Sequence, residues 1–339
     1  MKSLINRRAF GAAMLGATVA LGAGLGVTQA NAQSRTLRLS HHLAPGHLVD
    51  VASHRFADMV AEQSKGAIKV EVFPSGQIAG LRQGAEAVQF GTVDFVWTDF
   101  GTLANWRPEY GFVSLPFLFQ GDDHFDAVFN GEVGNVLRED VSKNLNIEAL
   151  GYGNASFRVI TTRDRPVKEP SDLQGVRIRV PEVPIFVSAF RTVGANPTPM
   201  AWGEVYTALQ TGVIDAVENP AEGLAVGGMQ EVTKYLSRTY HIMTDVNLFV
   251  SNEVLSSFTP EQQEIIRVSA KTAVDEFNTK THEAAAGYWD QLSAKLETVD
   301  EPNRAAFQEA MAPVWKEFTA AAGEAGQGWI DRVQAVPAK

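Results

Sequence analysis

The 339-residue sequence contains no cysteine. This excludes disulfides, thiolate metal sites, iron–sulfur clusters and a cysteine nucleophile. Basic residues are also scarce, because 29 Lys and Arg stand against 39 Asp and Glu, which gives a net charge of −10. Such a surface repels polyanions on average, so nucleic-acid binding is disfavoured. After the first thirty-odd residues no stretch reaches 18 apolar residues, so no membrane-spanning helix is expected there.

The N-terminal residues have the pattern of an export signal. Lys2, Arg7 and Arg8 precede about twenty small apolar residues, which end at the A-x-A triplet Ala30–Ala32. The segment predicts a signal peptide over residues 1–32, and Arg7-Arg8-Ala9-Phe10 resembles the twin-arginine type. An uncleaved membrane anchor is the alternative. We therefore expect a mature protein that is exported to the periplasm.

The chain that follows predicts an α/β protein. Thr36–Ser40 and Ile68–Phe73 alternate apolar and polar residues as strands do, and a helical spacing runs from His47 to Gln63 between them. The same order of elements restarts near residue 146, and Val176–Val180 is its clearest strand. Alternating strands and helices imply a mostly parallel sheet covered by helices. A second α/β unit is therefore expected at roughly residues 153–245.

One very long helix is predicted near the C-terminus. Thr259 suits the N-cap, Pro260 suits the first turn, and only Gly287 disfavours helix before about Glu297. At 1.5 Å per residue this helix is about 55 Å long and would run along both units. A break at Gly287 is the alternative. Two shorter helices are expected at residues 302–320 and 324–335.

Motifs of the common enzyme classes are missing from the sequence. It contains no GxSxG, GxxxxGK[ST] or HExxH pattern. Four histidines, His41, His42, His47 and His54, cluster in the first turn and helix. A metal site would need paired ligands with carboxylate support, so solvated or capping histidines are the preferred interpretation. An exported metal-dependent hydrolase remains an alternative function.

Arginines in strands indicate an anion site. Arg177 and Arg179 lie two apart on one strand and so share a face, and Arg179 directly precedes Val180-Pro181 at the carboxyl end. Open α/β sheets bind ligands at that end. Arg158 lies in an apolar run, Phe157–Ile160. In an acidic protein such arginines can offer paired donors to a small carboxylate, although they could instead pair with local acids.

These segments resemble a known family. Asp172–Pro181 fits the pattern D-x-x-G-x-x-x-R-V-P, Pro199–Asp215 continues it, and Glu218-Asn219-Pro220 follows. Upstream, Phe73–Ile78 and Leu115–Phe119 fit as well. The chain is similar in these motifs to the substrate-binding proteins of tripartite ATP-independent periplasmic (TRAP) transporters of the DctP type. An ABC-type solute-binding protein, which shares the two-lobe plan, is the runner-up.

The resemblance implies two α/β lobes joined by crossing strands, with one long helix spanning both. Lobe I would comprise residues 33–152 with 246–284, and lobe II residues 153–245. Helices within 285–339 would pack across the lobes. The implied function is capture of a small organic carboxylate in the interlobe cleft and its delivery to the membrane subunits of a TRAP transporter. No cofactor, metal, catalytic residue or nucleic-acid partner is implied.

The resemblance also implies which residues contact the ligand. Arg179 would form the main salt bridge to the carboxylate, Arg158 and Asn219 would assist, Trp202 would line the pocket and His42 would face it. Arg82, Trp97 and Thr98 complete the predicted ligand-binding set, and the two tryptophans suggest an apolar or aromatic part of the ligand. The family usually carries an acidic residue before the arginine at position 82, but this chain has Ala79-Gly80-Leu81. That departure argues against a polyhydroxylated or amino-bearing ligand.

Overall fold

The computed structural model describes residues 34–338, which form one compact unit. The predicted signal peptide, residues 1–32, lies outside the described residues. Within the described part of the chain no helix is both long and apolar enough to span a bilayer.

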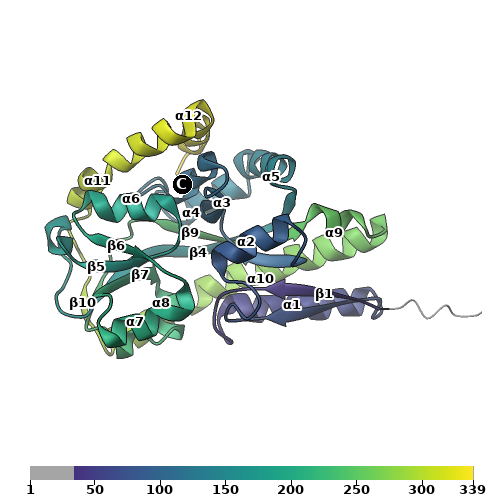
Figure 1. Ribbon diagram of the computed structural model, residues 1–339, viewed down its shortest axis with the longest axis horizontal. Coiled ribbons are helices and arrows are strands. Elements are labelled where there is room, and N and C mark those ends of the chain that lie inside the picture. Colours follow the sequence, from purple (N-terminus) through teal and green to yellow (C-terminus); the bar gives the residue numbers. More distant parts are fainter. Residues whose placement is uncertain (1–33, 339) are drawn as a thin grey trace, which may run out of the picture. The chain divides into compact units, whose positions relative to one another are not determined.

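Ten strands form one mixed sheet in residues 34–338 (Figure 1). Their spatial order is β2-β1-β3-β9-β4-β7-β5-β6, with β8 beside β4 and β10 beside β8. The strands are β1 (Arg35–Ser40), β2 (Ile68–Phe73), β3 (Phe95–Thr98), β4 (Ile147–Thr162), β5 (Arg177–Val180), β6 (Asn196–Pro199), β7 (Ala216–Pro220), β8 (Tyr235–Ser237), β9 (Met243–Ser251) and β10 (Glu297–Val299).

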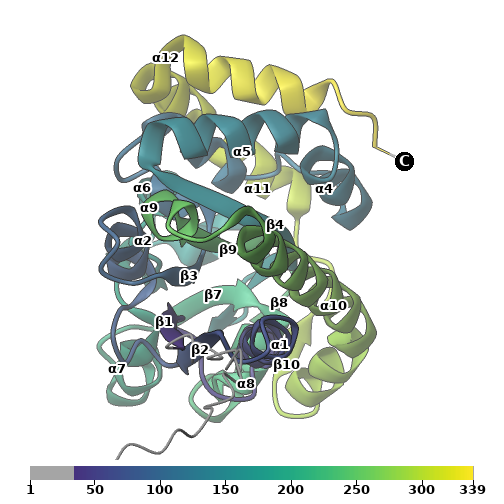
Figure 2. The same ribbon diagram turned by 90° about the vertical axis from the view of Figure 1, so that its right-hand side faces the viewer.

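Helices cover this sheet on both sides (Figures 1 and 2). The α-helices are α1 (Leu48–Gln63), α2 (Leu81–Gln89), α3 (Phe100–Leu103), α4 (Asp122–Phe129), α5 (Glu132–Leu145), α6 (Pro184–Thr192), α7 (Val205–Thr211), α8 (Ala221–Val226), α9 (Asn252–Ser256), α10 (Pro260–Ser293), α11 (Arg304–Met311) and α12 (Pro313–Gln334). Short 3-10 turns occupy Pro108–Ser114, Pro170–Leu173, Trp202–Glu204 and Met229–Glu231.

The predicted α/β architecture with two lobes is confirmed. We define the first lobe by β1, β2, β3 and β9, and the second by β5, β6 and β7; Figure 1 shows the second lobe, with α7 and α8, to the left of the first. Within each lobe β1–β2, β1–β3, β5–β6 and β5–β7 pair in parallel, as expected for strands joined by helices. The carboxyl ends of β1 and β3 therefore lie at the same edge of the first lobe, and those of β5 and β7 lie at the same edge of the second.

One strand belongs to both lobes. The strand β4 is unusually long, with 16 residues. Its first part pairs antiparallel with β9, and its last part, Arg158–Thr162, pairs antiparallel with β7. Two register shifts interrupt the β4–β9 ladder, at Ala149/Gly151 and at Asn154/Phe157. The second shift lies directly before the point where β4 changes its partner, and a bulged strand bends locally.

The long helix is confirmed and has no break. α10 has 34 residues, or about 50 Å of length at 1.5 Å per residue. Thr259 is its N-cap and forms a capping box with Gln262, and the helix passes through Gly287. It packs against α1 in the first lobe and α8 in the second. The helix predicted at 302–320 is divided before Pro313. The backbone of Gly323 is not helical, with φ of 60° and ψ of −151°, so α12 is kinked there, between the two predicted helices.

Local sequence signals explain the elements next to the site. Leu37 and Leu39 of β1 are buried and alternate with more exposed residues, as the pattern predicted. His47 caps α1, because its Nδ1 accepts the Val49 N–H at 3.1 Å. The helix ends at Gln63, and Gly66 closes the turn behind it, because its φ of 80° suits glycine and its N–H donates to the Ala61 carbonyl.

Candidate functional site

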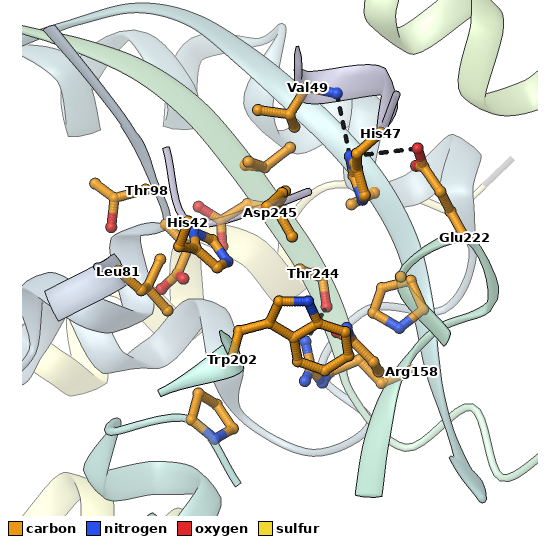
Figure 3. A pocket seen from close by; sticks show the side chains of 18 of the residues that line it. His42, His47, Val49, Leu81, Thr98, Arg158, Trp202, Glu222, Thr244 and Asp245 are labelled. Atoms are coloured by element: carbon orange, nitrogen blue, oxygen red, sulfur yellow. Dashed lines mark hydrogen bonds and ion pairs between the residues drawn. The ribbon is translucent and has the colours of Figure 1, made fainter. Parts of the chain in front are cut away.

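A cavity lies at the carboxyl ends of the strands, between the two lobes (Figure 3). The first lobe contributes residues that follow β1 and end β3, and the second contributes the ends of β5 and β7. The cavity holds about 80 Å³ of space that the centre of a water molecule can reach. The lining residues are His42, Leu43, His47, Val49, Leu81, Thr98, Asp99, Ser114, Ala155, Arg158, Arg179, Pro181, Phe186, Trp202, Asn219, Pro220, Glu222, Gly223, Met243, Thr244, Asp245 and Val246.

Arg179 brings a buried positive charge to this cavity. The residue is 4% exposed, and its guanidinium lies 5.3 Å from the centre of the Trp202 ring. Its Nε and Nη2 donate to the Met200 carbonyl at 2.9 and 2.7 Å. No carboxylate within residues 34–338 forms an ion pair with it. Burial lowers the pKa of Arg179 to about 9, so the cation lacks the solvation that water or an anion would supply.

Arg158 lies in the same cavity but is already paired. Its Nε and Nη2 donate to the two carboxylate oxygens of Glu218, and Nη1 donates to Thr244 Oγ1 at 3.1 Å. His241 also contacts this carboxylate, with Nε2 3.3 Å from Oε2. Glu218 is fully buried, and the neighbouring Arg158 is the main cause that keeps its pKa low against the opposing effect of burial. The two arginines therefore differ, because only Arg179 lacks a carboxylate partner.

Asn219 and Trp202 line the cavity beside Arg179, as predicted. Asn219 is half-buried near the carboxyl end of β7, where it pairs with Val159 of β4. Trp202 begins the 3-10 turn before α7 and contacts the apolar clusters of both lobes. An amide and an indole ring therefore flank the arginine in the cavity.

His42 and Thr98 line the first-lobe side of the cavity, also as predicted (Figure 3). Thr98 is fully buried, and its Oγ1 has no hydrogen-bond partner within residues 34–338. Nδ1 of His42 also has no hydrogen-bond partner within these residues. Burial, with smaller effects from nearby cationic groups, lowers the pKa of His42 to about 3, so the ring is neutral at pH 7.

Two predicted residues do not line this cavity. Trp97 is fully buried and packs on Phe277 of α10 at a ring distance of 6.0 Å. Neighbouring residues of a strand point to opposite faces. Thr98 faces the cavity, and the side chain of Trp97 therefore points the other way, into the core. Arg82 lies exposed on α2, whereas its neighbour Leu81 contributes to the lining. We therefore correct the predicted site by leaving out Trp97 and Arg82.

Two carboxyl groups lie in the lining, and only that of Asp245 was not anticipated from the sequence, since the end of the third strand pointed to Asp99 as well as to Thr98. Asp99 follows β3, and its Oδ1 accepts the Thr102 N–H at 2.5 Å. Asp245 lies on β9, and its Oδ2 accepts the Phe100 N–H at 2.8 Å and an Asn247 amide N–H at 2.5 Å. Burial raises the pKa of both acids, and the charge of Asp99 raises that of Asp245 further. The signal in the sequence was an acid inside an otherwise buried strand.

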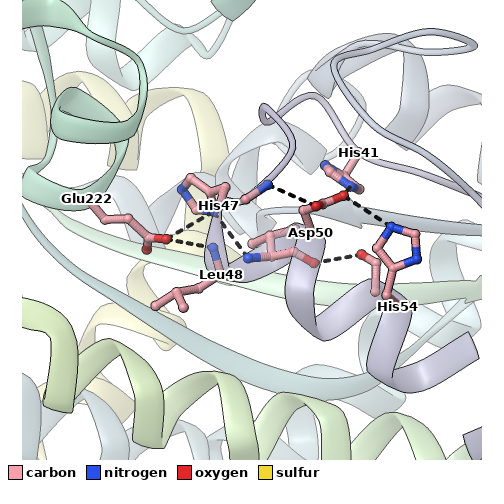
Figure 4. Close-up of polar contacts among 9 residues, drawn as sticks. His41, His47, Leu48, Asp50, His54 and Glu222 are labelled. Carbon is pink, nitrogen blue, oxygen red and sulfur yellow. Dashed lines mark hydrogen bonds and ion pairs between the residues drawn. The ribbon is translucent and has the colours of Figure 1, made fainter. Parts of the chain in front are cut away.

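A polar contact joins the lobes next to the cavity (Figure 4). Glu222 of α8 accepts the Leu48 N–H of α1 at 2.7 Å and lies 3.3 Å from His47 Nδ1. Burial raises the pKa of Glu222 to about 7 and lowers that of His47 to about 3, so both side chains prefer their neutral forms. The neighbouring His41 and His54 instead contact Asp50. Among residues 34–338 no three acid or histidine side chains group as metal ligands.

A ligand cavity at strand ends between two lobes that share crossing strands is the arrangement of a solute-binding protein. Comparison with known proteins agrees, because residues 39–321 match the bacterial extracellular solute-binding proteins of family 7, DctP. The chain belongs to this family, whose members bind solutes for TRAP transporters and are not enzymes. The resemblance stated from the motifs is thereby confirmed, and neither the ABC-type nor the hydrolase alternative is needed.

Individual relatives are similar along most of their length. A solute-binding protein of Roseobacter denitrificans is 31% identical over 294 residues, which cover 87% of this chain and 90% of that protein. The crystal structure of a TRAP periplasmic solute-binding protein of Sulfitobacter sp. NAS-14.1, with bound β-D-galacturonate, has a TM-score of 0.85. It is 30% identical, with 88% of this chain and 99% of that chain covered. The corresponding structure from Sulfurospirillum deleyianum, with bound succinate, has a TM-score of 0.83 at 27% identity and 89% and 99% coverage.

Proposed function

We propose that this protein captures a small organic acid in the periplasm, holds it in the interlobe cavity through Arg179, and delivers it to the membrane subunits of a TRAP transporter. One observation carries the proposal: Arg179 is a buried cation without a carboxylate partner, at the strand end where α/β folds bind ligands. The relatives with bound galacturonate and succinate support an acid as the ligand class.

The geometry suggests how the acid would be held. Nε and Nη2 of Arg179 are used by Met200, which fixes the plane of the guanidinium and leaves its Nη1 edge for a carboxylate. Asn219 can add an amide donor next to it. The indole of Trp202 offers an apolar surface to the carbon chain. In this low-dielectric setting the ion pair is much stronger than it would be in water.

The cavity volume favours a compact ligand. The cavity's volume of about 80 Å³ is small, so a ligand of few atoms fits it best. Contacts between Glu222 of the second lobe and Leu48 of the first close one side of this space. A ligand that contacts both lobes stabilises the closed arrangement, and closure then reports to the membrane subunits that the site is occupied.

Removal of the arginine tests the function. The variant Arg179→Ala should weaken binding of the preferred acid by roughly 2–5 kcal/mol, or about 30-fold to several thousandfold in Kd, because the carboxylate is buried without its partner. Isothermal titration against a panel that includes succinate and D-galacturonate measures this loss. Arg177→Ala is the matched control, since Arg177 lies on the same strand but pairs with Asp215 outside the cavity. Unchanged binding by Arg179→Ala would overturn the proposal.

A further inference from the structure

The cavity has a second polar end, on the first lobe. It is formed by His42 after β1, by Thr98 and Asp99 at the end of β3, and by Asp245 of β9. We call these four residues the acidic end. Figure 3 places Thr98, His42 and Asp245 on the opposite side of the cavity from Arg158. Arg179 lies on β5 of the second lobe, so a ligand that is held there and contacts both lobes meets the acidic end of the first lobe.

The two acids have unused hydrogen-bonding capacity. The bonds from Phe100 and Asn247 use only Oδ2 of Asp245, and the bond from Thr102 uses Oδ1 of Asp99. The second oxygen of each carboxyl group makes no hydrogen bond with the described residues. Two carboxylates buried close together disfavour double ionisation, so the pair retains a proton and presents both a donor and an acceptor.

Thr98 gives an independent reason to expect a polar ligand group here. Its hydroxyl is fully buried, has no partner in residues 34–338 and lines the cavity. A buried polar atom without a hydrogen bond costs about 1–3 kcal/mol, so such an atom normally has a partner. The unpaired Nδ1 of His42 has the same requirement. Both residues are able to donate and to accept, as hydroxyl groups do.

We propose that the acidic end binds hydroxyl groups, so that the ligand is a hydroxylated monocarboxylate rather than a dicarboxylate. This inference rests on the proposed function, because Arg179 must first orient the ligand. A second carboxylate at this end would lie against Asp99 and Asp245, where repulsion and desolvation oppose it. An ammonium group could pair with the acids, but it only donates, so it would offer no acceptor to the Thr98 O–H or to the proton that the acid pair retains.

The inference also revises the argument from the sequence. The lack of an acid in Ala79–Leu81 argued against a hydroxylated ligand. In the structure, Asp99 and Asp245 bring acids to the same cavity from β3 and β9, although Leu81 itself contributes only apolar lining. An acid absent from one segment is thus supplied from two others.

A set of four-carbon acids tests the inference with the full mature protein. D-erythronate, succinate, butyrate and 4-aminobutyrate have the same number of carbons and differ in what they present to the acidic end. Titration calorimetry at pH 7.5 should find D-erythronate bound at least about tenfold more tightly than the other three. Tighter binding of succinate or of 4-aminobutyrate, or binding of none of the four, would overturn the inference.

Two variants locate the selectivity. Thr98→Val removes the unpaired hydroxyl with little change in shape, so it should weaken erythronate binding about 5- to 100-fold without lowering the melting temperature of the free protein. Asp245→Asn should weaken erythronate binding and narrow the gap to succinate. Thr161→Val is the matched control, because its hydroxyl is also buried and unpaired but lies outside the cavity.

The outcomes separate this inference from the proposed function. If Arg179→Ala abolishes binding while Thr98→Val and Asp245→Asn leave the ranking of the four acids unchanged, the hydroxyl site is wrong and the proposed function stands. If Arg179→Ala binds every acid as the unmodified protein does, both are wrong. Equal losses in Thr98→Val and Thr161→Val would also overturn the inference, since a general packing effect would then explain them.

Discussion

The two arginines of the cavity should have opposite effects on the stability of the ligand-free protein. Arg158 neutralises Glu218, which is fully buried and receives both Nε and Nη2 of the guanidinium. Arg158→Met would leave that carboxylate buried with His241 as its remaining side-chain partner, and Thr239 contacts only the other ring nitrogen of this histidine. Breaking a buried pair from one side typically costs about 3–5 kcal/mol. The melting temperature should fall by roughly 5–15 °C.

Arg179 should behave differently, because it has no acid to neutralise. The depression of its pKa to about 9 corresponds to a penalty on the order of 5 kcal/mol for the buried charge. Its compensating contacts are two hydrogen bonds to Met200 and the Trp202 ring, worth about 1 kcal/mol each. Arg179→Ala should therefore melt no lower than the unmodified protein while it loses ligand binding.

Differential scanning calorimetry of the ligand-free proteins measures both effects. The double variant Arg158→Met/Glu218→Gln is the control, because it removes the charge left behind and should recover much of the stability lost in the single variant. The reasoning is refuted if Arg158→Met melts within about 2 °C of the unmodified protein. It is also refuted if the double variant melts below the single one.

The remaining predictions concern pH and two glycines. The pKa of His47 is lowered to about 3 in the folded protein, so the folded state binds fewer protons than the unfolded state below pH 6.5, and stability falls as the pH falls. The variant His47→Asn keeps a capping residue on α1 but has no imidazole to protonate. Between pH 7 and pH 5 its unfolding free energy, measured by urea titration, should fall by about 2 kcal/mol less than that of the unmodified protein. An equal fall in both proteins would contradict this. Glu222, whose pKa is raised in the folded protein, makes the folded state more stable as the pH falls, and it does so with and without the substitution. Gly287→Ala, at an exposed site inside α10, should raise the unfolding free energy by about 0.5–1 kcal/mol, because alanine favours helix more than glycine does. Gly323→Ala should instead lower the unfolding free energy by about 1–3 kcal/mol, because φ of 60° with ψ of −151° is accessible essentially to glycine alone. Thermal and urea unfolding of the pair gives both values, and a stabilising Gly323→Ala would show that the backbone relaxes there.

The sequence predicted the elements whose signals are local. The capped α10, the alternating β1 and β5 and the position of Arg179 at a strand end all follow from residues near one another in the chain. The partner of Arg158 was not predictable in this way. Glu218 reaches it only because β4 and β7 pair with Arg158 opposite Pro220, and such a register is set by the whole sheet.

The errors in the predicted site have the same origin. Trp97 and Thr98 are the last two residues of β3, and they point to opposite faces of it. The sequence does not say which of the two faces is directed at the cavity. Asp245 joins the site because β9 runs antiparallel beside β3 and brings it to the start of α3. Contacts between segments more than a hundred residues apart depend on how the whole sheet is assembled. Sequence patterns therefore locate the ends of strands more reliably than they locate the residues that meet there.

The shared strand β4 determines how the lobes can move. Because β4 pairs with β9 in one lobe and with β7 in the other, no free linker joins the two halves there. Opening must instead flex the strand where its ladder is irregular, near Asn154 and Ser156. Ser156 has a φ of 73°, and Asn154 braces this kink through Asp122, Asp126 and Asn278. Because both lobes share this one strand, a change in its bend near Ser156 would turn the lobes relative to each other and so change the width of the cavity between them.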